Sequence, residues 1–465
     1  MRVLLINPPS PEQLGSPLLG LEYVAAAMMS HGHEVRVIDA AARYFPHEAE
    51  WVAREARGFS PELIGVSLFT RWAWHAYQLV ERLRGGTWTL VAGGAHTTVR
   101  PEETLRRGFD VALAGEAEHS LPRLAKWLRG EDDIATIPGA AFPVQGGGIG
   151  YGPPAAFVED LDLLAPPYLA QSLFDPAWYS APGADWADTP APGGILTSRG
   201  CPARCTFCAN HVTGRSFRHR SARSVTDEIN AWHDLCGMRY FPCWDDALTA
   251  SPARLTALCE AIERDVRFPF SFGAITRANM VTRELLRTMR RAGLCHVNFG
   301  VESGDDEILR AIKKGIRTEQ VVRALEWAKE EGLVTACNFM LGFPQETPVE
   351  VERTLRFMER IAPMVDSFST MGVVVPFPGT PLYDDFQFEY GFKDWWLDPA
   401  YTRYQAPPGL DDPDAFYRYY VDDANLELDF FRYSPAMKTA IRECLRFKSE
   451  HNLRKMGLMP ALGVR

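Results

Sequence analysis

The 465-residue sequence contains no long hydrophobic run. The apolar segment near its N-terminus, Val3–Ile6, is interrupted almost at once by Pro8 and Pro9. A membrane-spanning helix needs about 20 consecutive apolar residues, and a signal peptide needs an apolar core of about 7 to 15. We therefore expect no signal peptide and no membrane partner, and we expect the protein to be cytoplasmic.

The sequence also lacks an excess of positive charge. Its 49 Lys and Arg residues face 59 Asp and Glu residues, which gives a formal net charge of -10. Proteins that bind nucleic acids usually carry a clustered surplus of Lys and Arg. This balance argues against a nucleic-acid partner and favours a small-molecule or protein substrate. Because 46% of the residues are apolar, a chain of this length is expected to form two or three domains.

Neither a P-loop nor the pattern G-x-G-x-x-G occurs in residues 1–137, so ordinary nucleotide binding loses support there. In this region short apolar runs alternate with amphipathic stretches, which predicts a doubly wound, Rossmann-like parallel sheet. Ligands of such sheets bind beyond the carboxyl ends of the strands. Those ends carry Asn7–Ser10, Ser67–Arg71, Gly93–His96 and Gly115–Glu116. A simpler interpretation of the glycines is that they form tight turns.

Residues 138–193 contain ten prolines, together with clustered glycines and aromatic residues. Proline disfavours long helices and central strands, so we expect an ordered but irregular linker.

Strands and helices alternate again over residues 194–385. The expected strands lie near 194–198, 240–244, 270–275, 296–301, 335–341 and 368–375, which predicts a partial (β/α)6 barrel. Polar or irregular segments follow all six strands, and barrel enzymes build their active sites at that face. Residues 386–465 are rich in Trp, Tyr and Phe, and we expect them to form a small helical cap. The predicted fold class is therefore α/β for the N-terminal domain and the barrel, followed by this small helical C-terminal domain.

Three cysteines lie close together in the sequence, but a fourth cysteine near them is missing. Cys201, Cys205 and Cys208 are followed by no other cysteine until Cys236. His211 supplies a fourth donor at the spacing of a structural zinc site, which remains an alternative. A bacterial ferredoxin pattern has a different spacing. The total of nine cysteines is odd, which favours buried thiols and metal ligands over a disulfide framework.

The loop C-x-x-x-C-x-x-C, with Phe207 before its last cysteine, resembles the radical S-adenosylmethionine (SAM) family. The resemblance implies that Cys201, Cys205 and Cys208 hold a 4Fe–4S cluster whose open iron binds SAM, and that reductive cleavage of SAM gives a 5′-deoxyadenosyl radical. It also implies an external electron donor of the flavodoxin or ferredoxin type. The segments WDD, TR and GVES resemble the family's SAM-binding strand ends. Their candidate SAM contacts are Asp245, Asp246, Arg277, Glu302 and Ser303. Alternatively, these side chains cap helices or form surface ion pairs. The usual G-G-E triplet is absent.

The N-terminal region, followed by a linker and a barrel, resembles the cobalamin-dependent branch of this family. The segments VAGGAHTTVRPEE and AGEAEHS resemble its pocket for the cobalamin tail. With the strand end at residue 67, the implied cofactor contacts are Ser67, Gly93, Gly94, His96, Thr98, Gly115, Glu116 and Glu118. The motif D-x-H-x-x-G, which supplies an axial histidine in many cobalamin proteins, is missing. The segment LFTRWAW then places Thr70, Arg71 or Trp72 near the lower face of cobalt, unless these residues serve only for packing and surface charge.

The resemblance implies a methyltransferase that acts on an unactivated carbon, or less commonly on phosphorus, of a small secondary metabolite. In that reading, methylcobalamin supplies the methyl group and the 5′-deoxyadenosyl radical activates the substrate. An enzyme with the same cofactors that performs oxidative cyclisation or rearrangement without methyl transfer is the first alternative. A zinc-stapled binding module without enzymatic activity is the second.

Overall fold

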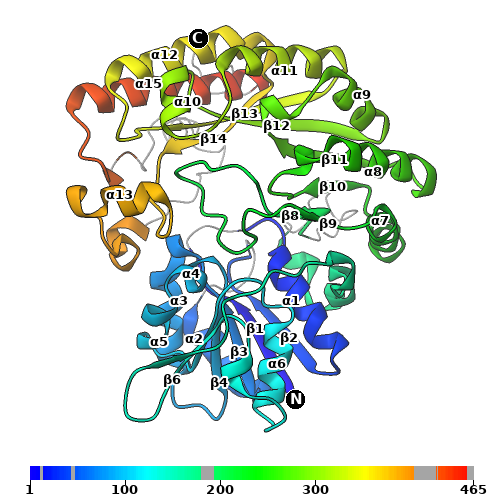
Figure 1. The fold of residues 1–465 in the computed structure, drawn as a ribbon, viewed down its shortest axis with the longest axis vertical. Helices are drawn as coiled ribbons and strands as arrows, with labels where there is room; N and C mark the ends of the chain where they lie inside the picture. Colours follow the sequence, from blue (N-terminus) through cyan, green and yellow to red (C-terminus); the bar gives the residue numbers. More distant parts are fainter. Residues whose placement is uncertain (11–13, 43–47, 180–192, 403–425, 427, 458–465) are drawn as a thin grey trace. The chain divides into compact units, whose positions relative to one another are not determined.

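The computed structural model describes residues 1–465 except 11–13, 43–47, 180–192, 403–425, 427 and 458–465 (Figure 1). The chain divides into two compact units. The first unit contains the described residues of Met1–Ile195, Ala209–Arg239 and Asp394–Tyr404. The second contains those of Leu196–Cys208, Tyr240–Lys393 and Gln405–Arg465. Neither unit is therefore one continuous segment of the sequence.

The first unit is built on a seven-stranded sheet with the order β2-β1-β3-β4-β5-β6-β7. The strands are β1 (Arg2–Asn7), β2 (Glu34–Asp39), β3 (Leu63–Ser67), β4 (Thr89–Gly93), β5 (Val111–Leu113), β6 (Ala140–Pro143) and β7 (Ile149–Tyr151). The first five are parallel, and their apolar side chains are largely buried. The predicted doubly wound sheet is confirmed. Burial on both faces explains why these strands are nearly continuous apolar runs.

The helices of the first unit cover both faces of its sheet. They are α1 (Leu19–Ser30), α2 (Ala49–Phe59), α3 (Ala73–Leu83), α4 (Ala95–Val99), α5 (Pro101–Arg106) and α6 (Ser120–Trp127). A further helix of this unit, α7 (Ala222–Cys236), contacts the turn η4 (Pro167–Leu173). Helix α1 contacts α6, and α2 contacts α3, in line with the two sides seen in Figure 1. The loops that carry the candidate cofactor residues are therefore confined to the carboxyl edge of the parallel strands.

The segment 138–193 is less irregular than its prolines predict. Its first part forms the hairpin β6–β7, which extends the sheet in antiparallel fashion from β5. The turn of this hairpin contains Gly146, Gly147 and Gly148, all with positive φ. Three glycines supply the left-handed conformations that the turn needs, so the prolines outside it do not prevent pairing. The remainder of the described segment consists of short 3-10 turns: η3 (Leu161–Leu163), η4 (Pro167–Leu173) and η5 (Pro176–Trp178).

The second unit contains a parallel five-stranded sheet with the order β10-β11-β12-β13-β14. The strands are β10 (Tyr240–Cys243), β11 (Ser271–Thr276), β12 (Leu294–Glu302), β13 (Val334–Leu341) and β14 (Ser367–Val373). The helices are α8 (Pro252–Asp265), α9 (Arg283–Arg291), α10 (Asp306–Ala311), α11 (Thr318–Glu330), α12 (Pro348–Ile361), α13 (Pro381–Tyr390) and α15 (Pro435–Lys455). Each of the first four strands is followed by at least one helix, as the alternating sequence pattern predicts.

The sixth strand expected in the barrel does not join this sheet. Of the expected residues 194–198, only the last belongs to a strand, the short β8 (Ser198–Arg199). The backbone N–H of Thr197 donates to a carboxylate oxygen of Asp245 at 2.6 Å. That donor is therefore not available to a strand ladder, and the segment is bound by a side chain instead.

The C-terminal region is divided between the two units. Helix α15 packs against α12 and β14 of the second unit. Within α15, the side-chain amide of Asn452 accepts a hydrogen bond from the Phe368 N–H and donates one to the Phe368 carbonyl, both at 2.9 Å. These bonds satisfy backbone groups on the edge strand β14, which otherwise invites pairing with another chain. The short turn η10 (Trp395–Leu397) belongs to the first unit. The aromatic residues of the predicted cap at 404, 417, 419 and 420 lie outside the described residues.

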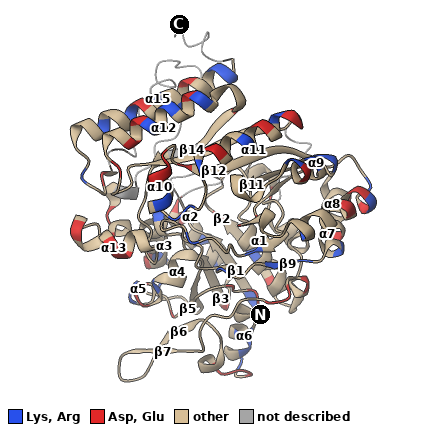
Figure 2. Ribbon diagram, turned by 45° about the horizontal axis from the view of Figure 1, so that its top comes forward, with Lys and Arg blue, Asp and Glu red and all other residues tan. Residues whose placement is uncertain are grey.

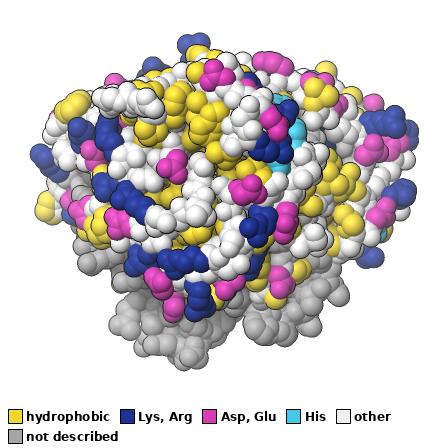
Figure 3. Space-filling view, turned by 90° about the horizontal axis from the view of Figure 1, so that it is seen from below, with side chains coloured by type: hydrophobic (Ala, Val, Ile, Leu, Met, Phe, Trp, Pro, Cys, Tyr) yellow, Lys and Arg dark blue, Asp and Glu magenta, His cyan; other side chains and the backbone are white. Residues whose placement is uncertain are grey.

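Charges of both signs lie mainly on the helices. Figure 2 shows Lys, Arg, Asp and Glu along α8, α9, α11, α12 and α15, while the strands carry few charges. Positive and negative side chains are also interspersed on the face drawn in Figure 3. In the part of the chain that the structure describes, no helix is both long enough and apolar enough to cross a membrane.

Candidate active site

The three cysteines of the C-x-x-x-C-x-x-C pattern lie on one loop of the second unit, directly after β8. Cys205 is buried, Cys201 is half-buried and Cys208 is exposed, and none of them forms a disulfide. Among the described residues, no three Cys, His, Asp or Glu side chains converge on the position of one metal ion. A zinc site needs such convergence, whereas the thiolates of a 4Fe–4S cluster each bind a different iron. Three thiols on one loop fit the donor chemistry of such a cluster.

Hydrogen bonds fix this cysteine loop to the second unit. The Thr206 N–H donates to the Ile312 carbonyl at 3.0 Å, and the Thr206 carbonyl accepts from the Leu382 N–H at 2.9 Å. At the start of the loop, Asp246 accepts from the Gly200 N–H at 2.9 Å. Gly200 has a φ of +86°, a conformation that glycine adopts without a steric penalty. Both the start and the middle of the loop are therefore held in place.

The two predicted aspartates after β10 differ in their surroundings. Asp245 is buried, and it accepts hydrogen bonds from the N–H and hydroxyl of Thr197, both at 2.6 Å, and from the Ser198 hydroxyl. Arg254 holds the same segment through the Thr197 carbonyl at 2.6 Å. Asp246, in contrast, is exposed. The structure thus uses Asp245 to brace the chain that leads into the cysteine loop.

Arg277, at the end of β11, lies beside the cysteine loop. Its Nη1 donates to Cys205 Sγ at 3.3 Å. Its Nε is buried and has no hydrogen-bond partner among the described residues. Buried N–H groups are nearly always hydrogen-bonded, and a guanidinium pairs with a carboxylate through two parallel bonds. The arginine therefore fits a carboxylate-bearing ligand next to the cluster cysteines, such as the methionine moiety of SAM.

Glu302 ends β12 and has a positive φ of 74°. Lys314 Nζ donates to Glu302 Oε1 at 2.7 Å, and both side chains are buried. The same Nζ lies 5.9 Å from the ring centroid of Phe207 in the cysteine loop. A Cβ at Gly300 would lie 2.9 Å from both charged atoms, so glycine leaves room for the ion pair. Sequence reasoning missed Lys314, because nothing in the pattern of a lysine after α10 indicates a buried partner.

The last of the predicted SAM contacts, Ser303, is fully buried. Its hydroxyl accepts from the Asp305 N–H at 3.2 Å and lies 3.2 Å from the Thr354 hydroxyl. Asp305 is the N-cap of α10. Ser303 thus helps to shape the turn into this helix.

Glu346, which the sequence interpretation did not include, lies at the turn that follows β13. Its Oε2 accepts from the N–H groups of Gly342 at 2.7 Å and Phe343 at 2.9 Å, while Oε1 is buried and has no partner among the described residues. The hydroxyl of Tyr433 donates to the Gly342 carbonyl at 2.7 Å. The Phe343 ring lies 5.8 Å from that of Phe207. The turn therefore supports the aromatic residue of the cysteine loop.

In the first unit, the loops after β3 and β4 are joined to one another. The Leu68 N–H donates to the Gly93 carbonyl at 2.8 Å, and the His96 N–H donates to the Leu68 carbonyl at 3.0 Å. A Cβ at Gly94, which has a φ of +94°, would lie 2.9 Å from the Leu68 carbonyl oxygen and 3.3 Å from Ser67 Oγ. A Cβ at Gly93 would meet nothing within 4 Å. Packing inside the chain thus requires Gly94, whereas Gly93 borders open space.

Thr98 connects the loops after β4 and β5. Its hydroxyl donates to the Gly94 carbonyl at 2.9 Å and accepts from the Gly115 N–H at 3.0 Å. Gly115 has a φ of +80°, and a Cβ there would lie 2.8 Å from the Cβ of Ala155. These contacts bring three predicted residues together at one edge of the sheet.

Glu116 is engaged within the chain. It forms a buried two-point ion pair with Arg218, with N–O distances of 2.9 and 2.8 Å, and accepts from the Val158 N–H at 2.6 Å. Glu118 is also buried. The sequence offered no signal for Arg218, which is 102 positions away from Glu116. These contacts give Glu116 a role in joining the β5 loop to later parts of the first unit.

His96 is fully buried and uses both ring nitrogens in hydrogen bonds, one of them to the Thr70 hydroxyl at 3.1 Å. Of the three candidates for the lower face of cobalt, Thr70 is therefore buried against this histidine. Arg71 and Trp72 are half-buried, with the guanidinium carbon 5.2 Å from the indole centroid.

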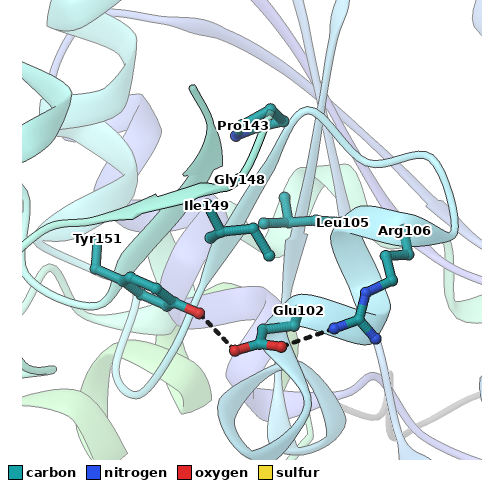
Figure 4. A pocket seen from close by; sticks show the side chains of 7 residues that line it. All are labelled: Glu102, Leu105, Arg106, Pro143, Gly148, Ile149 and Tyr151. Atoms are coloured by element: carbon teal, nitrogen blue, oxygen red, sulfur yellow. Dashed lines mark hydrogen bonds and ion pairs between the residues drawn. The ribbon is translucent and has the colours of Figure 1, made fainter. Parts of the chain in front are cut away.

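A pocket of about 600 Å³ opens on the first unit between α5 and the β6–β7 hairpin (Figure 4). In it, Glu102 accepts a hydrogen bond from the Tyr151 hydroxyl at 2.8 Å and pairs with Arg106 at 2.7 Å. Because β6 runs antiparallel to β5, the hairpin turn lies toward the amino ends of the parallel strands. This pocket is therefore separate from the loops that carry the predicted cofactor residues.

Comparisons with known proteins identify both parts of the chain. The sequence model of the radical SAM superfamily matches residues 195–358, and that of the B12-binding domain matches residues 15–125. The chain thus contains a radical SAM domain and a B12-binding domain. Its cofactors are a 4Fe–4S cluster, SAM and cobalamin. The resemblance inferred from the cysteine loop and the N-terminal glycine segments is confirmed at this level.

Two curated relatives and one solved structure are similar over most of the enzyme. An uncharacterised methyltransferase of Pyrococcus horikoshii is 28% identical over 395 residues, which covers 83% of each chain. An anaerobic magnesium-protoporphyrin IX monomethyl ester cyclase of Cereibacter sphaeroides is 26% identical over 432 residues, covering 88% of this chain and 68% of the relative. The radical SAM methyltransferase TsrM of Kitasatospora setae, solved with tryptophan and a SAM analogue, shares the fold. Its TM-score is 0.67 at 21% identity, with 84% of this chain and 77% of that chain covered.

Proposed function

We propose that this enzyme is a methyltransferase that acts on a small secondary metabolite. The favoured site of methylation is an unactivated carbon, and phosphorus is the less favoured one. The observation that carries the proposal is the combination of a cysteine loop flanked by Arg277 with a doubly wound domain in which His96 is committed to contacts inside the protein. The uncharacterised methyltransferase of P. horikoshii, which matches 83% of this chain, supports methyl transfer.

The residues of the second unit have distinct roles in the proposal. Cys201, Cys205 and Cys208 hold the cluster, and Arg277, whose Nε has no partner among the described residues, binds the SAM carboxylate. When bound, the cluster and SAM supply the radical, and cobalamin supplies the methyl group. Asp246 is the exposed carboxylate at the same strand ends, and it is our candidate for the SAM ammonium group.

The residues of the first unit bind and orient cobalamin in the proposal. Gly93, which borders open space, would leave room for the cofactor, and the loop of Thr70, Arg71 and Trp72 would supply the residues nearest the lower face of cobalt. Because His96 has both nitrogens bound within the protein, it does not supply an axial imidazole. An external flavodoxin-like or ferredoxin-like donor supplies the electron.

A cyclase or rearrangement enzyme with the same cofactors is the second candidate. The cyclase of C. sphaeroides supports it, because that relative matches 88% of this chain. The two functions consume SAM differently. Methyl transfer to the cofactor forms S-adenosylhomocysteine, whereas a rearrangement needs only the radical and forms 5′-deoxyadenosine.

This difference gives a test that needs no substrate. The anaerobically reconstituted, reduced holoenzyme is mixed with SAM carrying a labelled methyl group, and both coproducts are counted. We expect a burst of S-adenosylhomocysteine that is stoichiometric with bound cobalamin. Formation of 5′-deoxyadenosine without this burst would refute methyl transfer and favour the cyclase.

The cysteine assignment has its own control in the same assay. The variant with Cys201, Cys205 and Cys208 all replaced by alanine should lose its iron and form no 5′-deoxyadenosine. Replacement of Cys236, which lies outside the loop, should change neither quantity. A triple variant that keeps its iron and still cleaves SAM reductively would contradict the assignment.

A further inference from the structure

A buried polar cluster in the first unit has partners that the cofactor motifs do not explain. It consists of Thr70, Tyr77, His96, Glu103 and Trp396, and we call it the His96 cluster. Four of its members lie in the N-terminal sheet domain, within or between the elements that follow β3 and β4. The fifth comes from the turn η10, nearly 300 positions later in the sequence.

The histidine connects the loop after β3 with the helices that follow it. Its Nδ1 lies 3.1 Å from the Thr70 hydroxyl, and its Nε2 lies 3.0 Å from the Tyr77 hydroxyl and 3.3 Å from Glu103 Oε1. Tyr77 in turn donates to Glu103 Oε1 at 2.9 Å. Both ring nitrogens are thus within hydrogen-bond distance of a partner, as burial of a polar ring requires.

Trp396 closes this arrangement from the C-terminal part of the chain. Its indole N–H lies 3.0 and 3.2 Å from the two carboxylate oxygens of Glu103. Its ring packs on His96 with centroids 5.4 Å apart, and the guanidinium carbon of Arg100 lies 5.3 Å from the indole centroid on a cation–π contact. The indole is fully buried, and η10 also contacts η1 (Thr70–Trp72) and α3.

The charge at the centre of the cluster is stabilised by its donors. Burial by itself raises the pKa of Glu103, but the hydrogen bonds from His96, Trp396 and Tyr77 together lower it by more, so that the pKa lies below its usual value. Burial and the neighbouring carboxylate raise the pKa of Tyr77, which keeps its hydroxyl as a donor. The nearby cations are Arg100, which faces the indole, and Arg107, whose guanidinium carbon lies 5.5 Å from the Tyr77 centroid.

We propose that His96 and Trp396 are positioning residues, which hold the loop Leu68–Trp72 in the shape that presents Arg71 and Trp72. His96 makes two contacts with this loop. Its backbone N–H donates to the Leu68 carbonyl, and its ring Nδ1 is hydrogen-bonded with the Thr70 hydroxyl. Trp396 acts through Glu103 and the ring of His96. The positioning follows from these contacts alone, whereas its purpose, to shape the lower face of bound cobalt, rests on the proposed function.

The test replaces Trp396 by phenylalanine, which keeps a buried aromatic ring and removes the donor to Glu103. Hydrogen bonds to charged groups are stronger than neutral ones, so we expect amides of the loop 68–72 and of helix α4 to exchange about tenfold faster or more. The measurement is hydrogen–deuterium exchange of the protein without cobalamin. The matched control is Trp88→Phe in the same unit, which removes an indole N–H that donates to the Leu83 carbonyl at 3.1 Å. Unchanged exchange in these segments of W396F, or an equal increase in W88F, would overturn the proposal.

A second variant and a spectroscopic measurement complete the test. Glu103→Gln keeps the shape of the side chain and removes its charge, and it should increase exchange in the same segments. With cobalamin added, we expect W396F and E103Q to alter the electron paramagnetic resonance spectrum of the bound Co(II) form, whereas W88F leaves it unchanged. Faster exchange with an unaltered spectrum would leave the positioning intact and overturn its connection to cobalt.

Discussion

Glu346 is buried at the turn after β13, and burial raises its pKa from 4.5 to about 8. The N–H groups of Phe343 and Gly342 oppose this effect but do not cancel it. In the unfolded chain the carboxyl group releases its proton near the ordinary value of 4.5. Between these two values the folded state binds more protons than the unfolded state, so the free energy of unfolding must fall as the pH rises.

The replacement Glu346→Gln removes this titration and keeps the hydrogen bonds. The amide oxygen accepts from the two N–H groups as Oε2 does, and the amide nitrogen takes the place of the protonated oxygen. With pKa values of 4.5 and about 8, one carboxyl group lowers the free energy of unfolding by roughly 3 kcal/mol between about pH 5.5 and about pH 8.5. We therefore expect the free energy of unfolding to fall by about 3 kcal/mol less in the variant than in the wild-type protein as the pH rises over this interval.

Urea denaturation of both proteins at the two pH values measures this difference. Glu22, in the first unit, also has a pKa raised to about 8 by burial, so it contributes equally to both proteins. Glu319→Gln is the matched control in the same unit, because the hydrogen bonds with Arg360 lower the pKa of the Glu319 carboxyl group, and its titration lies below the interval. An equal loss of stability in E346Q and the wild-type protein would refute the argument that Glu346 is protonated in the folded state at neutral pH.

Two other predictions concern one residue in each unit, Lys314 in the second and Gly94 in the first. Lys314→Met should lower the free energy of unfolding by about 3 to 5 kcal/mol, because it leaves the carboxylate of Glu302 buried without its partner. Addition of Glu302→Gln in the same chain should restore most of this loss, and a loss below about 1 kcal/mol in the single variant would contradict burial of the pair. Gly94→Ala should cost about 2 kcal/mol or more, because of its positive φ and the close approach to the Leu68 carbonyl. Gly93→Ala, whose Cβ points into open space, should cost much less in the same denaturation assay, and equal costs would argue against the packing given for Gly94.

The sequence was sufficient to locate most strands and the elements that carry the candidate site. Apolar runs such as Val3–Ile6 and Val334–Leu341 are recognisable because strands buried on both faces contain few polar residues. The cysteine spacing was informative for a different reason, since cluster chemistry fixes the residue type and the interval between ligands. The hairpin β6–β7 was missed because the prolines around it concealed a short pair of strands joined by three glycines.

Partners that are distant in the sequence were not predictable. Local patterns do not connect Glu116 with Arg218 or Glu103 with Trp396, because only the folded chain brings these pairs together. The same limit applies to Thr197, which looked like the end of an apolar strand. Its backbone is bound by a side chain that lies 48 positions later, so a run of β-forming residues did not become a strand of the sheet.

Three carboxylates at the strand ends of the second unit show why residue type alone does not define their roles. Asp245 accepts several hydrogen bonds from Thr197 and Ser198, Glu302 is paired with Lys314, and Glu346 is kept protonated by burial. A carboxyl group that is already hydrogen-bonded, ion-paired or protonated gains little from a ligand cation, since the cation must displace the existing partner or proton. In the proposed function, binding of the SAM ammonium group by a carboxylate therefore falls more readily to a side chain that solvent still reaches. Among the aspartates that follow β10 this side chain is Asp246, and its bond to Gly200 ties such binding to the start of the cysteine loop.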